Sequence, residues 1–203
     1  MTYWLWREAD GIYHIHRYLS KRHHPESDLV TNPSYYFKVH GSGMSTAKAI
    51  IETVAEFLER VVVPVPPSGI ERSNIEIACK GRVFHRKKPR PRRHDENEIS
   101  LEVEKSTIKI VDFPVGKDIL LVDDICTTGR SISLYKDWCL ELGAKSVECL
   151  AYGRVKPKED NRILGIAVID VGGFDMEDLT DKLSGFNLDE IDFGDLTGRL
   201  QDL

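Results

Sequence analysis

The sequence predicts an α/β protein with a mainly parallel sheet of about five strands, flanked by helices and extended at both chain ends. Short apolar runs rich in β-branched residues are typical of buried parallel strands. Segments with helical periodicity alternate with these runs along the chain. We expect an N-terminal extension or hood over residues 1–43, a core over 44–171 and an acidic C-terminal extension over 172–203.

The first half of the core contains one clear helix and one clear strand. From Met44 onward apolar residues recur every three or four positions, which predicts a helix of about four turns. The run Val61–Val65 is typical of a buried strand, and the loop Pro66–Gly69 ends it. Thr107–Val111 alternates between apolar and polar residues, so we expect it to pair beside the central strands.

The second half repeats the alternation of strand and helix. Ile119–Val122 predicts a buried strand, and a helix ended by Gly143 follows it. Two later apolar runs predict further strands, Val147–Tyr152 and Gly165–Val171. Near the start of the chain, the loose alternation in Ile12–Tyr18 predicts one more strand. The apolar face of the helix consists of Ile132, Tyr135, Trp138, Cys139 and Leu142.

Composition limits the class of protein. The chain has 203 residues, of which 41% are apolar and 30% are charged, close to globular averages. No stretch approaches the ~18 apolar residues of a membrane span, and residues 1–6 lack the features of a secretory signal. We therefore expect a cytoplasmic protein without membrane contact. The cysteines form no C-x-x-C pair and are expected to be buried, reduced thiols: Cys79, Cys126, Cys139 and Cys149.

Charge is segregated along the chain, although the net charge is only -5. The stretch Lys80–His94 holds eight Lys or Arg residues and no acid, whereas Asp170–Leu203 holds ten acids and two bases. This asymmetry suggests one surface for an anion and a second, acidic surface for a partner.

The segment Ile119–Ser131, ILLVDDICTTGRS, carries the main functional signal. The carboxylates Asp123 and Asp124 follow a predicted strand, at the end of the strand where α/β folds bind ligands. Thr127–Ser131 then supplies hydroxyls, a glycine and amides at the start of a helix, which suit a phosphate. Carboxylates beside a phosphate site suit sugar hydroxyls, so the pattern predicts a ribose 5-phosphate group as ligand.

This segment closely resembles the phosphoribosyl pyrophosphate (PRPP) motif of type I phosphoribosyltransferases, except that Cys126 stands where a larger aliphatic residue is usual. The resemblance implies the type I phosphoribosyltransferase fold. It also implies that Asp123 and Asp124 act in catalysis by holding the ribose hydroxyls, while Thr127–Ser131 holds the 5-phosphate. Mg²⁺ is the implied cofactor, bound through PRPP near the two aspartates rather than by the protein directly. The implied PRPP-binding residues are Asp123, Asp124, Ile125, Cys126, Thr127, Thr128, Gly129, Arg130 and Ser131.

A weaker resemblance covers other parts of residues 61–155. Val63–Ser68, Glu71–Asn74 and Gly143-Ala144 resemble the ComF-like branch of that family. In the family, the loop after the first strand faces pyrophosphate and often contains an unusual cis peptide, so a cis bond is expected at Pro66 or Pro67. The implied pyrophosphate-loop residues are Pro66, Pro67, Ser68, Gly69 and Arg72.

The most basic part of this stretch, Arg86–Arg93, lies where the family carries a mobile loop that covers the reaction. The resemblance assigns Arg86, Lys87, Lys88 and Arg90 to such a lid, whose cations would stabilise the departing pyrophosphate. Two alternatives stay open, namely a nucleic-acid contact and a solvated run of charge.

Two functions remain open from the sequence. One is transfer of ribose 5-phosphate from Mg-PRPP to a nitrogen of an unidentified base, with release of pyrophosphate. The other is a non-catalytic PRPP- or nucleotide-binding protein with a regulatory or nucleic-acid-associated role, including a ComF-like one. The chain ends are expected to form a base-binding hood or the surface of a homodimer. Tyr35–Phe37 is either a stacking platform for the base or part of the core, and the core is favoured.

Overall fold

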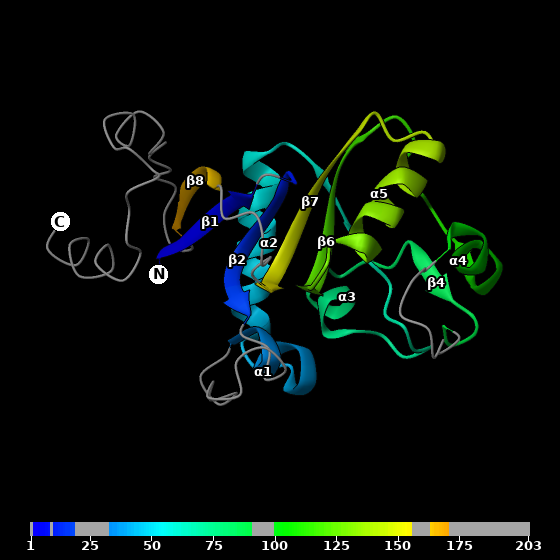
Figure 1. Cartoon of the computed structure of the whole chain (residues 1–203), viewed down its shortest axis with the longest axis horizontal. Helices are drawn as coiled ribbons and strands as arrows, with labels where there is room; N and C mark the ends of the chain where they lie inside the picture. The colour runs from blue at the N-terminus through cyan, green and yellow to red at the C-terminus, as the bar shows by residue number, and fades with distance from the viewer. Residues whose placement is uncertain (1, 9, 19–32, 91–99, 156–162, 171–203) are drawn as a thin grey trace, which may run out of the picture.

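The structure is a computed structural model that describes residues 2–8, 10–18, 33–90, 100–155 and 163–170 (Figure 1). Its main sheet has six strands in the order β3-β6-β7-β2-β1-β8, and a second sheet pairs β4 with β5. The strands are β1 Thr2–Glu8, β2 Ile12–Tyr18, β3 Val61–Pro64, β4 Phe84–Arg86, β5 Ile108–Ile110, β6 Asp118–Cys126, β7 Ser146–Val155 and β8 Ile163–Asp170. The helices are α1 Pro33–His40, α2 Met44–Phe57, α3 Asn74–Ala78, α4 Leu101–Thr107 and α5 Arg130–Glu141.

Most strands of the main sheet run in one direction. β3, β6, β7 and β2 form three consecutive parallel pairs. β1 is antiparallel to both of its neighbours, β2 and β8, so β8 again runs with the parallel strands. The expectation of an α/β fold with a mostly parallel sheet flanked by helices is therefore confirmed.

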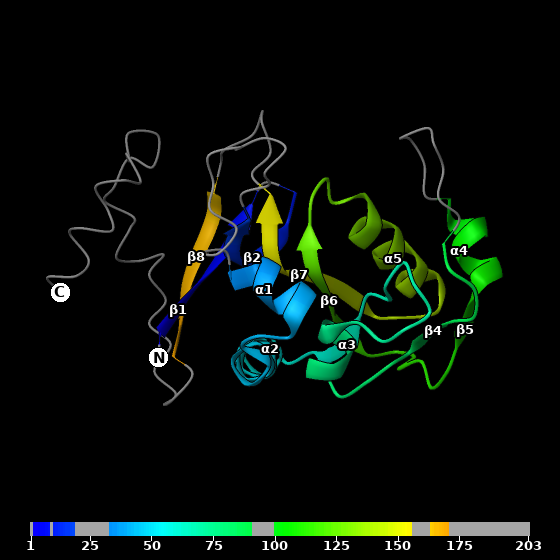
Figure 2. The ribbon, with the colours of Figure 1, turned by 90° about the horizontal axis from the view of Figure 1, so that it is seen from below.

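Helices cover both faces of the sheet (Figure 2), and the side chains of β6 alternate between them. Leu120 and Val122 pack in a cluster with the buried face of α2. Ile119 and Leu121 belong to the opposite cluster, which includes the buried face of α5. Because β6 is buried on both faces, its continuous apolar run is the pattern expected of a central parallel strand.

The two main helices follow their predicted positions. α2 buries an apolar stripe that includes Ile50 and Val54, and α5 buries Tyr135 and Trp138. After the end of α5, Gly143 adopts a φ of +92°, a conformation in which a residue with a side chain would be strained.

The prediction that Thr107–Val111 pairs beside the central strands is wrong. β5 instead pairs antiparallel with β4 in the separate small sheet, with Phe84 opposite Ile110. Phe84 packs against Tyr135 and Trp138, with ring centroids 5.1 and 5.0 Å away, so the small sheet lies against α5. The alternating pattern specified a strand but carried no information about its partner.

The N-terminal segment contributes more to the main sheet than expected. β1 and β2 belong to this sheet, which therefore has six strands rather than about five and begins well before residue 44. β2 lies parallel to β7 and buries Ile12 and Ile15, so the sheet continues past the apolar strand β7. The expected acidic extension, residues 172–203, lies outside the described residues.

Within the described ranges, none of the helices combines the length and apolar character needed to cross a membrane. The cysteines are free thiols; three are buried and Cys79 is half-buried. Burial raises their pKa values, to about 11 for Cys126 and about 12 for Cys139, which keeps them protonated at neutral pH. The prediction of reduced, mostly buried thiols is confirmed for this part of the chain.

Truncating Leu121 should test whether β6 is central to the core. Leu121→Ala removes a fully buried side chain and should lower the free energy of unfolding by about 2–5 kcal/mol. The matched control is Leu140→Ala, because Leu140 is 43% exposed and its loss should change stability by roughly 0.5 kcal/mol or less. Urea unfolding followed by circular dichroism measures both, and equal losses would contradict the assignment.

Candidate functional site

Two segments that are distant in sequence meet at the carboxyl edge of the main sheet. In the parallel pair of β3 and β6, Pro64 lies opposite Val122, and the Val65 N–H continues the pairing by donating to the Val122 carbonyl at 2.8 Å. Consequently Pro66–Gly69, which follows β3, lies at the same edge as Asp123–Gly129, which comprises the last residues of β6 and the loop after them. This edge is the usual ligand position in parallel α/β sheets.

The first segment differs from expectation in one respect. The described residues contain no cis peptide bond, so the prediction of a cis bond at Pro66 or Pro67 is wrong. The all-trans chain already gives the Pro67 and Ser68 carbonyls partners, the Arg86 side chain and the Arg90 N–H. Ser68 itself is exposed.

Two further members of the predicted pyrophosphate loop are also exposed. Gly69 lies beside open space, since nothing lies within 4 Å of a Cβ added there. Arg72 donates to the Glu76 carbonyl of α3 at 3.1 Å while remaining exposed. The open side of this loop is therefore accessible to a ligand.

The aspartates of the second segment lie at the end of β6 and point to opposite faces of the sheet by strand alternation. Asp124 shares the side of Val122 and forms an ion pair with Lys38 of α1, with 2.9 Å between Nζ and Oδ1. Asp123 lies on the α5 side, where its Oδ1 accepts the Asp124 N–H at 2.8 Å. The two carboxylates therefore lie on opposite faces of the sheet, just before the loop that follows β6.

The carboxylate pair is electrostatically strained. Burial raises the pKa of Asp123 to about 7, and the neighbouring charge of Asp124 adds to the shift, while Lys38 opposes it. The site would therefore hold a cation, or a proton shared between the carboxylates, more readily than two free aspartates would.

The loop after the aspartates has the properties of a phosphate cradle. Gly129 precedes α5 with a φ of +79°, and no side chain caps the helix there. The first-turn N–H groups of α5 consequently lack a side-chain cap and can donate to an anion, assisted by the helix dipole. Thr127 and Thr128 are exposed beside this turn, and their hydroxyls add further donors.

The unusual Cys126 of the motif has a structural explanation. Arg154, at the end of β7 and only 3% exposed, donates to the Cys126 Sγ at 3.1 Å and pairs with Asp10. A larger aliphatic residue at position 126 would occupy the space of this guanidinium. Asp10 in turn approaches the phosphate loop, since its carboxylate lies 3.8 Å from a Cβ added to Gly129.

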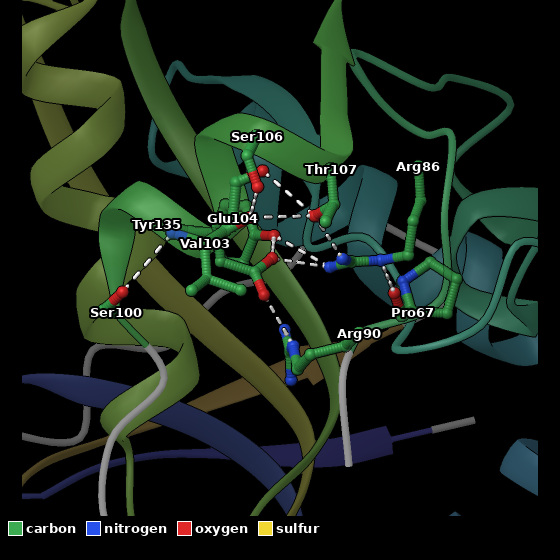
Figure 3. Close-up of polar contacts among 9 residues, drawn as sticks. All are labelled: Pro67, Arg86, Arg90, Ser100, Val103, Glu104, Ser106, Thr107 and Tyr135. Atoms are coloured by element: carbon green, nitrogen blue, oxygen red, sulfur yellow. Dashed lines mark hydrogen bonds and ion pairs between the residues drawn. The ribbon is translucent and has the colours of Figure 1, made fainter. Parts of the chain in front are cut away.

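The residues predicted to form a lid divide into two groups. Arg86 and Arg90 are bound by Glu104 of α4, at 2.5 and 2.6 Å, and Arg86 is only 3% exposed (Figure 3). This placement does not fit a cover that closes over a ligand. Lys87 and Lys88 are exposed, and the last residues of the stretch, from 91 onward, lie outside the described residues.

Sequence reasoning missed several side chains that this arrangement depends on. Lys38 and Glu104 sit in segments without a motif, and only their burial or pairing in three dimensions identifies them. Of the predicted aromatic run, Phe37 belongs to the core, because it is fully buried and its ring centroid is 4.7 Å from that of Tyr152. The prediction that this run belongs to the core is confirmed for Phe37. The side chains of Tyr35 and Tyr36 are not among those that the structure describes.

The chemistry of the site fits a magnesium ion that arrives with its ligand. Among the described residues, no group of three or more His, Cys, Asp or Glu side chains could hold a metal. Mg²⁺, however, is commonly bound by one or two carboxylates together with substrate phosphates. Asp123 and Asp124, adjacent to the phosphate cradle, offer such carboxylates.

Comparison with known proteins gives no match: no protein-family profile matches this chain, and a search of curated proteins finds no significant similarity.

The strained carboxylate pair predicts a pH-dependent gain of stability in Asp123→Asn. Because the folded-state pKa of Asp123 is raised, its contribution to stability is complete below pH ~4 and is lost as the pH rises through about 7. In ligand-free buffer, the variant should therefore exceed wild type by roughly 1–3 kcal/mol at pH 8 and by little at pH 4.5.

The matched control is an aspartate whose pKa is shifted in the opposite direction. Hydrogen bonds from Lys145 and Ser146 lower the pKa of Asp118, so Asp118→Asn should give no gain at pH 8. Thermal unfolding across this pH range measures both variants. A stability difference for Asp123→Asn that does not grow with pH would contradict the electrostatic account.

The backbone at Gly129 predicts a second, simpler effect. An alanine at φ +79° is strained, and its Cβ would lie 3.3 Å from the Ile12 Cδ1, so Gly129→Ala should cost about 1–2 kcal/mol of stability. Gly69→Ala is the control, because Gly69 has no positive φ and faces open space. Chemical unfolding that ranks the two variants equally would contradict the assigned conformation.

Proposed function

We propose that this chain binds Mg-PRPP and transfers its ribose 5-phosphate group to a nitrogen of a base, with release of pyrophosphate. One observation carries the proposal: the parallel pairing of β3 and β6 brings the open loop Pro66–Gly69 next to the aspartate pair and the uncapped start of α5. PRPP has an anionic group at each end of a polyhydroxylated sugar. An anion cradle, a carboxylate pair and a second loop with free amides match this order of groups.

Each part of the ligand has a partner in this proposal. Thr127–Ser131 and the first turn of α5 bind the 5-phosphate. Asp123 and Asp124 accept hydrogen bonds from the ribose hydroxyls, and Ser68 and Gly69 face the pyrophosphate. Lys38 holds the Asp124 carboxylate in position until the sugar replaces or shares its contact.

The reaction breaks the bond between the anomeric carbon and a pyrophosphate oxygen, and the electron pair leaves with pyrophosphate. A bond forms between the same carbon and a lone pair of the base nitrogen. Positive charge develops on the sugar between these events, and Asp123 and Asp124 stabilise it as fixed negative charges. Asp123 and Asp124 would help to hold Mg²⁺ together with the ligand phosphates, and the ion would neutralise charge on the leaving group. The protein contributes mainly position and electrostatics.

A second candidate is a protein that binds PRPP or a nucleotide without catalysis. One observation favours it: Arg86 and Arg90, expected to cover the departing pyrophosphate, are engaged by Glu104 instead. The exposed residues Lys87 and Lys88 are then available to a regulatory or nucleic-acid partner.

Titration of the purified chain with PRPP and Mg²⁺ tests the proposal. Wild type should bind PRPP, and Asp124→Asn should weaken binding about 10- to 100-fold, because a hydrogen bond to a charged acceptor is worth roughly 1.5–3 kcal/mol. Asp137→Asn is the control, since Asp137 is an exposed aspartate on α5 beyond its first turn and should leave affinity unchanged.

A screen of nitrogenous bases for pyrophosphate release then separates the two candidates. Release with one base that falls in parallel with binding in Asp124→Asn supports the transferase. Tight binding without release for every base supports the non-catalytic protein. No binding by folded wild type rejects both.

A further inference from the structure

The carbonyl groups of the predicted pyrophosphate loop are held from one side. The Nε of Arg86 donates to the Pro67 carbonyl at 2.5 Å, and the backbone N–H of Arg90 donates to the Ser68 carbonyl at 2.8 Å (Figure 3 shows the former). Two consecutive peptide units are therefore anchored through their oxygens to the last residue of β4 and to the segment that follows it.

This anchoring determines where the amides of the loop point. In a trans peptide unit the C=O and N–H bonds point in opposite directions, and the described residues have only trans bonds. With the Pro67 and Ser68 carbonyls fixed, the N–H groups of Ser68 and Gly69 face away from the arginines. Within the described chain, neither amide donates to another backbone group, and the space beside Gly69 is open. Two adjacent, outward amides form a concave donor pair that suits an anion.

A single carboxylate holds both anchoring residues in place. Glu104 is fully buried; its Oε2 receives Arg86 at 2.5 Å and its Oε1 receives Arg90 at 2.6 Å. The Tyr135 hydroxyl also donates to Oε2. Burial alone would raise the pKa of Glu104, but its hydrogen bonds with Arg90, Tyr135 and Arg86 outweigh burial and lower it. The carboxylate is therefore ionised.

The charge of this cluster also favours an anion. Two guanidinium groups face one carboxylate, which leaves an excess positive charge behind the loop. Arg86 is fully buried as a side chain and Arg90 is 19% exposed, so solvent screens this charge less than it would at the surface. An anion on the open side of Ser68 and Gly69 would experience both the amide donors and this charge.

We propose that Glu104 is a positioning residue that orients the Ser68 and Gly69 amides toward pyrophosphate by holding Arg86 and Arg90 against the loop carbonyls. This inference rests on the proposed function. It gives Arg86 and Arg90 a fixed role behind the loop in place of the lid expected from the sequence.

The test compares two anions that occupy different halves of the site. Full-length wild type is titrated with Mg-pyrophosphate and, separately, with ribose 5-phosphate. Glu104→Gln keeps the shape of the side chain and removes its charge; it should weaken pyrophosphate binding tenfold or more and change ribose 5-phosphate binding less than twofold. Lys105→Met on the same helix is the control, because Lys105 pairs with the exposed Glu141 at the surface and its loss should leave both affinities unchanged.

A milder variant covers the case in which Glu104→Gln does not fold. Arg90→Lys keeps the positive charge and the backbone N–H that binds Ser68 but loses the Nε contact with Glu104 at 2.6 Å. It should weaken pyrophosphate binding by a smaller factor, again without affecting ribose 5-phosphate. Thermal unfolding of each variant reports any general loss of structure.

The outcomes separate this inference from the function it rests on. A selective loss of pyrophosphate affinity supports the positioning role. Unchanged pyrophosphate affinity, or an equal loss for both anions, overturns it, while ribose 5-phosphate binding that depends on Asp124 leaves the proposed function intact. If wild type binds neither anion nor PRPP, the proposed function and the inference both fail.

Discussion

The structure depends on the parallel pairing of β6 with β3 on one side and β7 on the other. From Ile119 to Val122, β6 lies between two parallel neighbours and is buried on both faces, so the backbone groups and side chains of these residues are committed to the interior. Functional groups can be presented only by the last residues of β6, which pair with β7 but extend past the end of β3. The aspartates follow directly after Val122, and the parallel partner strand delivers Pro66–Gly69 to the same edge. The location of the candidate site is thus a consequence of strand direction.

The charges of Asp123 and Asp124 explain why cationic side chains lie at this edge of the sheet. Two adjacent carboxylates at the end of a buried strand repel each other and lose solvation, which is costly unless cations are near. The structure supplies Lys38 from α1 for Asp124. Beside the phosphate loop, the Asp10–Arg154 pair joins the turn before β2 to the end of β7. Segments before residue 44 therefore participate in the site as well as in the sheet, which explains why they cannot be treated as a detached extension.

The sequence predicted local features well and partnerships poorly. The buried run before Asp123, the apolar face of α5 and the glycine after it follow from periodicity and from the conformational needs of glycine, which depend on near neighbours. The pairing of β5 with β4 and the entry of β1 and β2 into the main sheet depend on contacts between distant residues. The site divides in the same way: the aspartate and loop residues are adjacent in sequence, whereas Lys38 and Glu104 become recognisable only through their partners.

The basic stretch illustrates why composition alone is an uncertain guide to function. Its residues have the same charge, yet Arg86 is buried against Glu104 while Lys87 and Lys88 are exposed. Burying Arg86 and most of the Arg90 side chain with one glutamate carries a large desolvation cost, and apolar residues of similar volume often give equal or greater stability in such places. Stability is therefore a weak reason for this cluster. The hydrogen bond from the Arg86 side chain to the Pro67 carbonyl offers a stronger one, since an apolar side chain could not donate it and so could not fix the direction of that peptide group. What the cluster contributes is the orientation of the loop beside the candidate site.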